Sequence, residues 1–181
     1  PPPPPSIPAI VGVHHRADGG SIRAIDFDAI KRANPTGYKF YKSTPDDYIV
    51  IRGLGIPLDF CVTRLDHPLE THPIVFYING STGIYDQPIQ EALAAGVTLI
   101  EFFNEPNIPE GGLDKMWRTS GEFAAVCALL MDTIKTRYPQ VRLLSPALSP
   151  QPNVAEWWES MQRAGIFVRA AGIAAHSYWS L

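Results

Sequence analysis

One short segment combines residue types that could do acid–base chemistry. An apolar run from Leu99 to Phe103 is followed at once by Asn104 and Glu105, and Pro106 then interrupts the run. A parallel strand delivers the side chains at its C-terminal end into the functional site of an α/β fold. A glutamate has a reference pKa of about 4.3 and stays protonated near neutrality only where burial or a nearby negative charge raises this value. We therefore predict that Glu105 is a catalytic acid and that Asn104 donates a hydrogen bond beside it.

Further polar residues follow the other β-like segments, and parallel strands would bring all of them to one rim. They are His14, His15, Arg16 and Asp18 after the first segment, Lys42 after the second, Arg64 after the third, and His176 and Tyr178 after the last. Successive strand residues point to opposite faces, so only one of His14 and His15 can enter the pocket, and we select His14. His176 and Tyr178 lie two residues apart and share a side, where Trp179 could stack on a ligand ring. The structural alternatives are a core pair for His176 and Tyr178 and simple packing for Trp179.

Arg64 and Glu101 each have a functional and a structural interpretation. Arg64 could orient a catalytic carboxylate through a charge-assisted hydrogen bond. Glu101 lies four residues before Glu105 and would share its face in an unbroken strand. An internal ion pair would account for both residues, and for Glu101 we prefer that structural role. For Asn104 the structural alternative is to cap the turn before Pro106.

Short β-like and helix-like segments alternate along the chain, which is typical of βα units around a parallel sheet. The predicted strands are 9–14, 38–42, 57–64, 97–103, 141–147 and 171–176, and the predicted helices are 26–34, 44–55, 86–96, 119–138 and one that begins at residue 153. We expect Asp26 to cap the first helix. Thr119 and Glu122 have the spacing of a capping box at the start of the longest helix. That helix should bury a stripe made of Phe123, Cys127, Leu130 and Ile134.

Consecutive βα units of this length predict an α/β fold of the (β/α)₈ TIM-barrel type. Such a barrel typically needs about 250 residues, so we expect an incomplete one, with about six of its eight βα units, over residues 9–181. Residues 1–8 are expected to form a proline-rich linker. The alternative is a doubly wound sheet, which should carry a glycine-rich phosphate turn after its first strand. The segment HHRAD at residues 14–18 does not resemble such a turn.

Composition excludes several classes of partner. The 15 basic and 18 acidic residues give a net charge of −3 with no basic block, so we expect no nucleic-acid partner. No apolar run approaches the roughly 20 residues of a membrane-spanning helix, so no membrane partner is expected. Cys61 and Cys127 lie among apolar residues and are predicted to be buried free thiols rather than a disulfide. We expect neither an organic cofactor nor a metal.

The chain resembles the clan A glycoside hydrolases, retaining (β/α)₈ enzymes that include cellulases, mannanases and xylosidases. The resemblance rests on VGVH at residues 11–14, FFNEP at 102–106 and HSYW at 176–179. It implies that Glu105 is the acid/base residue, that Asn104 is the asparagine preceding it, and that a carbohydrate is the substrate. It also implies that His176 and Tyr178 are the His-x-Tyr pair of strand six. The clan's nucleophile is a glutamate at the end of strand seven, so we expect a chain truncated before that strand, inactive alone, whose longer parent is the enzyme.

Two other functions remain open. One is a non-catalytic carbohydrate-binding or structural barrel module. The other is a metal-dependent barrel hydrolase with His14 or His15, Asp18 and His176 as ligands, although adjacent histidines have the wrong parity for one site. An open barrel would expose strand edges, which predicts association with a missing C-terminal barrel portion or with a second copy. A polysaccharide substrate and a proline linker would suit an extracellular or cell-surface setting.

Overall fold

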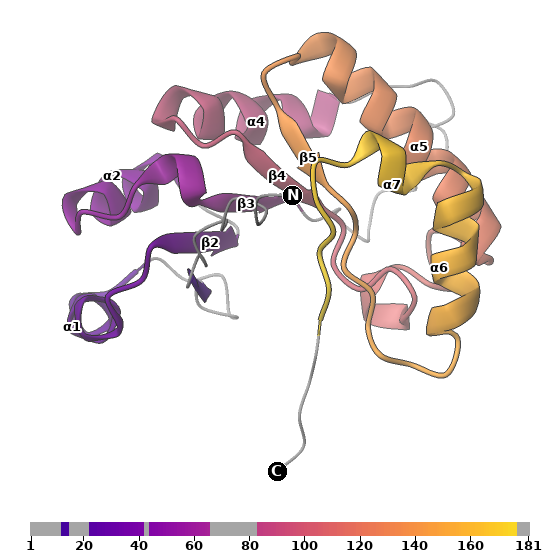
Figure 1. Ribbon diagram of the computed structural model, residues 1–181, viewed down its shortest axis with the longest axis horizontal. Helices are drawn as coiled ribbons and strands as arrows, with labels where there is room; N and C mark the ends of the chain where they lie inside the picture. The colour runs from indigo at the N-terminus through magenta and orange to yellow at the C-terminus, as the bar shows by residue number, and fades with distance from the viewer. Residues whose placement is uncertain (1–11, 15–21, 42–43, 66–82, 177–181) are drawn as a thin grey trace, which may run out of the picture.

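The computed structural model describes residues 12–14, 22–41, 44–65 and 83–176. Its centre is one sheet of five parallel strands, which lie side by side in chain order (Figure 1). The strands are β1 (Gly12–His14), β2 (Gly37–Tyr41), β3 (Val62–Leu65), β4 (Leu99–Phe102) and β5 (Arg142–Leu144). Parallel neighbours in sequence order require a crossover after each strand, and such a succession of βα units builds the wall of a barrel.

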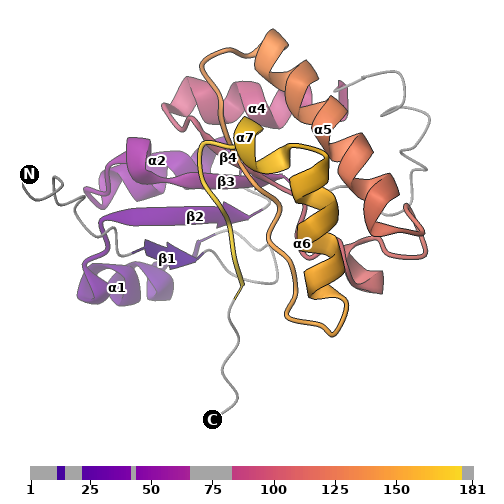
Figure 2. The ribbon, with the colours of Figure 1, turned by 45° about the vertical axis from the view of Figure 1, so that its right-hand side comes forward.

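Helices supply these crossovers and follow one another in an arc on the outer side of the sheet (Figures 1 and 2). They are α1 (Ala24–Ala33), α2 (Pro45–Gly53), α4 (Gly83–Ala95), α5 (Ser120–Arg137), α6 (Val154–Arg163) and α7 (Ile166–Arg169), with 3₁₀ turns at η1 (Leu58–Phe60) and η2 (Pro109–Gly111). The predicted fold class, an incomplete (β/α) barrel, is confirmed. None of the helices among the described residues has both the length and the apolar character needed to span a bilayer.

The core fills the space between the strands and the helices. Phe40 and Phe102 are fully buried, and their rings contact Tyr48 of α2 and Tyr85 of α4, respectively. Side chains alternate between the two faces of a strand. The residues next to Phe40 and Phe102 in the sequence therefore point to the opposite, concave face of the sheet. That concave face carries Lys39 and a row aligned across three strands, in which Tyr41 pairs with Arg64 and Arg64 with Glu101.

The start of the longest helix was predicted correctly. The Thr119 hydroxyl accepts a hydrogen bond from the Glu122 backbone N–H at 3.1 Å, and the whole predicted stripe is buried. The Glu122 carboxylate accepts from Arg118 N–H at 2.9 Å rather than from the cap residue itself. Cys61 and Cys127 are buried and free, as predicted.

Several predicted boundaries were wrong. Asp26 does not cap α1, because the helix begins earlier; Arg23 is the cap residue, and Asp26 accepts from its N–H at 2.8 Å. The predicted strand 57–64 starts as the turn η1, because Cys61 N–H bonds to Leu58 C=O instead of to a neighbouring strand. Helix α4 starts at Gly83 rather than at residue 86. Helix α7 was not anticipated.

The sixth predicted strand, 171–176, is reduced to one bridge beside β5. Gly172 pairs in parallel with Leu144, and two backbone hydrogen bonds, Ala171 N–H to Leu143 C=O and Ser145 N–H to Gly172 C=O, measure 2.7 and 3.0 Å. The segment therefore continues the sheet in the predicted place and direction. It carries His176 toward the C-terminal end of β4.

Candidate active site

The segment that carries Glu105 departs from strand geometry immediately after β4. Phe103 and Glu105 have φ angles of 56° and 48°, in the left-handed region that side chains other than glycine seldom adopt. Each such residue costs on the order of 1–2 kcal/mol, so the surroundings must hold it in place. Glu101 and Glu105 therefore do not share a face of one unbroken strand, because β4 ends between them.

Glu105 is nevertheless held beside the sheet. Its N–H donates to Ala147 C=O at 2.8 Å, and Asn104 forms a parallel bridge with the same residue. Only 9% of its surface is exposed. The carboxyl group thus stands at the C-terminal end of a parallel strand, the position at which barrel enzymes place reacting groups.

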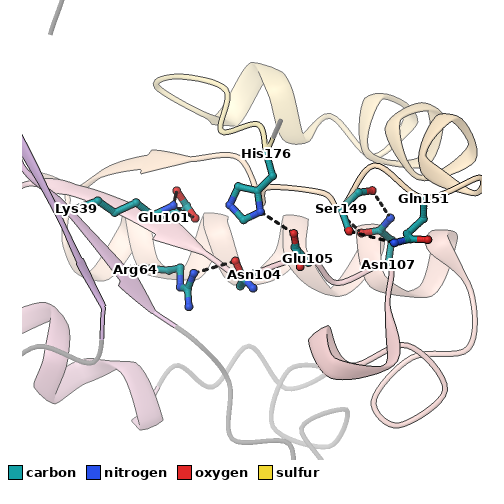
Figure 3. Close-up of polar contacts among 9 residues, drawn as sticks. All are labelled: Lys39, Arg64, Glu101, Asn104, Glu105, Asn107, Ser149, Gln151 and His176. Carbon is teal, nitrogen blue, oxygen red and sulfur yellow. Dashed lines mark hydrogen bonds and ion pairs between the residues drawn. The ribbon is translucent and has the colours of Figure 1, made fainter. Parts of the chain in front are cut away.

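His176 lies against this carboxyl group. Its Nδ1 is 2.9 Å from Glu105 Oε1, although the two residues are 71 positions apart. Figure 3 shows the imidazole ring of His176 pointing to the Glu105 carboxyl group. Their side chains are 17% and 11% exposed. An imidazole and a carboxyl group in contact can share or exchange a proton, because each has both a donor and an acceptor form. The structure therefore brings these two predicted site residues together.

Arg64 and Asn104 form a second contact at the same strand ends. Arg64 Nη1 donates to Asn104 Oδ1 at 2.9 Å (Figure 3). The guanidinium carbon of Arg64 also lies 3.7 Å from the centroid of the Tyr41 ring. Arg64 is 8% exposed, so this stacking replaces part of its hydration. Because Oδ1 accepts from Arg64, the amide nitrogen of Asn104 is the atom of this side chain that can donate a hydrogen bond.

Glu101 has the structural role that we preferred for it. Both of its oxygens accept from Lys39 Nζ at 2.7 Å, and the residue is only 3% exposed. Its partner is thus Lys39 on β2. A carboxylate with both oxygens in a buried ion pair is poorly placed to act as a nucleophile.

The other predicted residues fall into two groups. His14 is exposed on β1 in register with Lys39, so it lies on the concave face that also carries Arg64. Six predicted residues lie outside the described part of the chain, namely His15, Arg16, Asp18, Lys42, Tyr178 and Trp179. Within the described ranges, no three His, Cys, Asp or Glu side chains are grouped as metal ligands.

Asn107 is a site residue that our sequence analysis missed. It is 1% exposed, donates from Nδ2 to Ser149 C=O at 2.8 Å, and accepts at Oδ1 from Ser149 N–H at 2.9 Å. Nearby, Trp117 Nε1 donates to Pro106 C=O at 2.8 Å. The only signal in the sequence is an asparagine directly after Glu-Pro, which is equally typical of an ordinary turn.

No family model matches the chain, and no curated protein matches it. Solved structures do. The catalytic domain of GH30 xylanase C from Talaromyces cellulolyticus superposes with a TM-score of 0.60 at 12% identity over 93% of this chain and 52% of that one. A GH128 (subgroup I) endo-β-1,3-glucanase from Amycolatopsis mediterranei, in complex with laminaritriose, gives a TM-score of 0.50 at 14% identity over 93% of this chain and 56% of that one.

These similarities concern the fold, since the sequence identities are low. The chain spans about half the length of the two structures that it matches. One is the catalytic domain of a xylanase and the other is an endo-β-1,3-glucanase, and the described residues reproduce one part of their fold. The chain therefore has a glycoside-hydrolase-like fold.

Proposed function

We propose that this chain carries the acid/base part of a glycoside hydrolase site, which cleaves O-glycosidic bonds in a poly- or oligosaccharide with retention of configuration. The observation that carries the proposal is the Glu105–His176 contact of 2.9 Å between Oε1 and Nδ1, formed by a buried carboxyl group at the end of a barrel strand. The resemblance of the 102–106 and 176–179 motifs to clan A, and the fold of the two matching structures, support the same function.

The proposed chemistry follows from what a glycosidic bond requires. The leaving oxygen must receive a proton as the bond breaks, and in a retaining enzyme the same residue later takes a proton from the incoming water. Glu105 performs both transfers. His176 holds Oε1 and thereby fixes the plane of the carboxyl group. Asn104, turned by Arg64, donates to a sugar hydroxyl, an interaction that accelerates the reaction if it strengthens in the transition state.

A retaining mechanism also needs a nucleophilic carboxylate about 5–5.5 Å from the acid/base residue. We propose that a longer parent protein supplies it from outside these 181 residues, and that the 181-residue chain alone does not turn over substrate. Glu101 is not a candidate, because Lys39 binds both of its oxygens. The proposed sugar-binding residues, besides Asn104, are His14, Arg64, His176, Tyr178 and Trp179.

The test compares leaving groups in the longer polypeptide encoded downstream of Leu181 in the same reading frame. Substrates are phenyl and 2,4-dinitrophenyl β-xylosides and β-glucosides, with xylan and β-1,3-glucan as polymers. Glu105→Gln should lower kcat/KM for phenyl glycosides by about 10²–10⁴-fold, since their poor leaving group needs the proton. For dinitrophenyl glycosides kcat/KM should be unchanged. Their kcat should fall, because the attack of water lacks its base, and added azide should restore kcat.

Glu159→Gln is the matched control, because that glutamate is exposed on α6 and pairs only weakly with Arg163 at 3.5 Å. It should behave as wild type on every substrate. A Glu105→Gln enzyme with the same loss for all leaving groups would contradict the acid/base assignment. Turnover by the 181-residue chain itself would contradict an external nucleophile, and a stop codon directly after Leu181 would favour the carbohydrate-binding module.

A further inference from the structure

The segment that follows β5 holds the backbone at Glu105 and directly after it. Glu105 N–H donates to Ala147 C=O at 2.8 Å. After the left-handed turn at Glu105, the next hydrogen bond to the same segment comes from the Asn107 side chain, which pairs with Ser149. These two contacts lie two residues apart on each segment and hold the two ends of the short stretch from Glu105 to Asn107.

The Asn107 carboxamide takes the place of a peptide group in the pairing with the segment that follows β5. It donates to Ser149 C=O at 2.8 Å and accepts from Ser149 N–H at 2.9 Å, so it pairs with one residue as a neighbouring strand would (Figure 3). Its Nδ2 also donates to Asn153 Oδ1 at 3.1 Å, and Asn153 Nδ2 returns a bond to Asn107 C=O at the same distance. An aspartate has the same shape but no donor, and a glutamine is one methylene longer.

We propose that Asn107 is a positioning residue for the acid/base carboxyl of Glu105, an inference that rests on the function proposed above. The physical argument is that Phe103 and Glu105 occupy backbone conformations that relax unless their surroundings over-determine them. Ile108 N–H donates to Glu105 C=O at 3.2 Å and closes the turn, so a displacement of residue 107 is transmitted directly to residue 105. Without the carboxamide, the Glu105 side chain moves away from His176.

The contact with His176 provides a readout that needs no catalysis. The full 181-residue chain is labelled with ¹⁵N at its five histidines, and the His176 ring nitrogens are assigned by their loss in His176→Gln. Glu105→Gln defines the Nδ1 resonance of a ring that has lost its carboxyl partner. Asn107→Asp and Asn107→Ala should each shift Nδ1 most of the way to that reference. Asn153→Ala, a milder change at a partly exposed residue, should shift it in the same direction by less.

Ser160→Ala is the control for a loss of folding stability. It removes a buried hydrogen bond of 2.8 Å between Ser120 and Ser160 where α5 meets α6, without touching residues 103–107. Its His176 spectrum should overlay that of wild type even though its unfolding midpoint falls. A loss of folding stability alone therefore does not produce the expected signal.

The outcomes separate this inference from the proposed function. If Glu105→Gln shifts the His176 signal while the Asn107 and Asn153 variants leave it in place, Asn107 has no positioning role and the proposed function stands. If Glu105→Gln itself leaves the signal unchanged, the contact that supports both proposals is not formed, and both are overturned. In the longer polypeptide, Asn107→Asp should lower kcat for phenyl glycosides by about 10–100-fold and spare kcat/KM for dinitrophenyl glycosides.

Discussion

Lys39→Met tests whether the concave face of the sheet has a buried, mutually dependent ion pair. The Lys39 ammonium lies 2.7 Å from both oxygens of Glu101, whose side chain is 3% exposed, while Lys39 itself is 21% exposed. Methionine fills much of the space of the lysine stem but removes its charge. The variant therefore leaves a carboxylate inside the protein without its cation.

The expected loss is large. Removing one partner of a buried ion pair typically costs about 3–5 kcal/mol, because the remaining charge stays desolvated. Since Lys39 is partly reached by water, we expect the lower end, about 3 kcal/mol. Glu101→Gln should cost less, about 1–2 kcal/mol, because the partly exposed lysine can turn its ammonium group to water. The double variant should resemble Glu101→Gln, so the coupling energy should equal the cost of Lys39→Met, about 3 kcal/mol.

Urea unfolding followed by far-UV circular dichroism measures these free energies. Arg163→Met is the matched control, because it removes a cation from a surface pair whose side chains are 68% and 67% exposed, and such pairs contribute less than about 1 kcal/mol. A Lys39→Met variant within about 1 kcal/mol of wild type, or a coupling energy near zero, would refute the reasoning.

Two further predictions concern the thiols and the guanidinium group. Burial raises the pKa of Cys61 from 9.0 to about 11 and that of Cys127 to about 12. The folded state thus retains these protons more tightly than the unfolded chain, so their contribution to stability is complete below about pH 9 and is lost as the pH rises toward 11. Urea midpoints should fall over this pH range, and iodoacetamide should label neither thiol near neutral pH before the protein unfolds. A urea midpoint that stays constant to pH 11 would contradict the raised pKa of the buried thiols. Arg64→Lys keeps the charge but loses the planar group stacked on Tyr41. It should lower the free energy of unfolding measured in urea by about 1 kcal/mol and weaken the binding of xylo- or laminari-oligosaccharides measured by calorimetry. Unchanged stability and binding together would exclude a role for the stacking.

The elements that lie on regular periods were predictable from the chain alone. Alternating strands and helices indicated a barrel wall, and the Thr119 hydroxyl and the buried stripe that includes Cys127 placed the longest helix. An apolar run that ends in Asn104 and Glu105 located the proposed site at a strand end. These features are local, because caps and side-chain periods depend on residues within a few positions of one another.

The contacts within the site were less predictable. Alternation along a strand suggested that Glu101 and Glu105 share a face, but the left-handed backbone at Phe103 and Glu105 ends the alternation between them. A side-chain period carries no information once the backbone leaves the strand.

The sequence by itself determined which residue types stand at the ends of the strands, and with them the chemistry that the site could perform. Only the tertiary structure decided their partners. Lys39 reaches Glu101 across 62 positions, and the Asn107 carboxamide pairs with Ser149 across 42. Such pairings depend on the register between strands and on the path of the loops that join them, and these are set when distant segments pack together to bury their apolar faces.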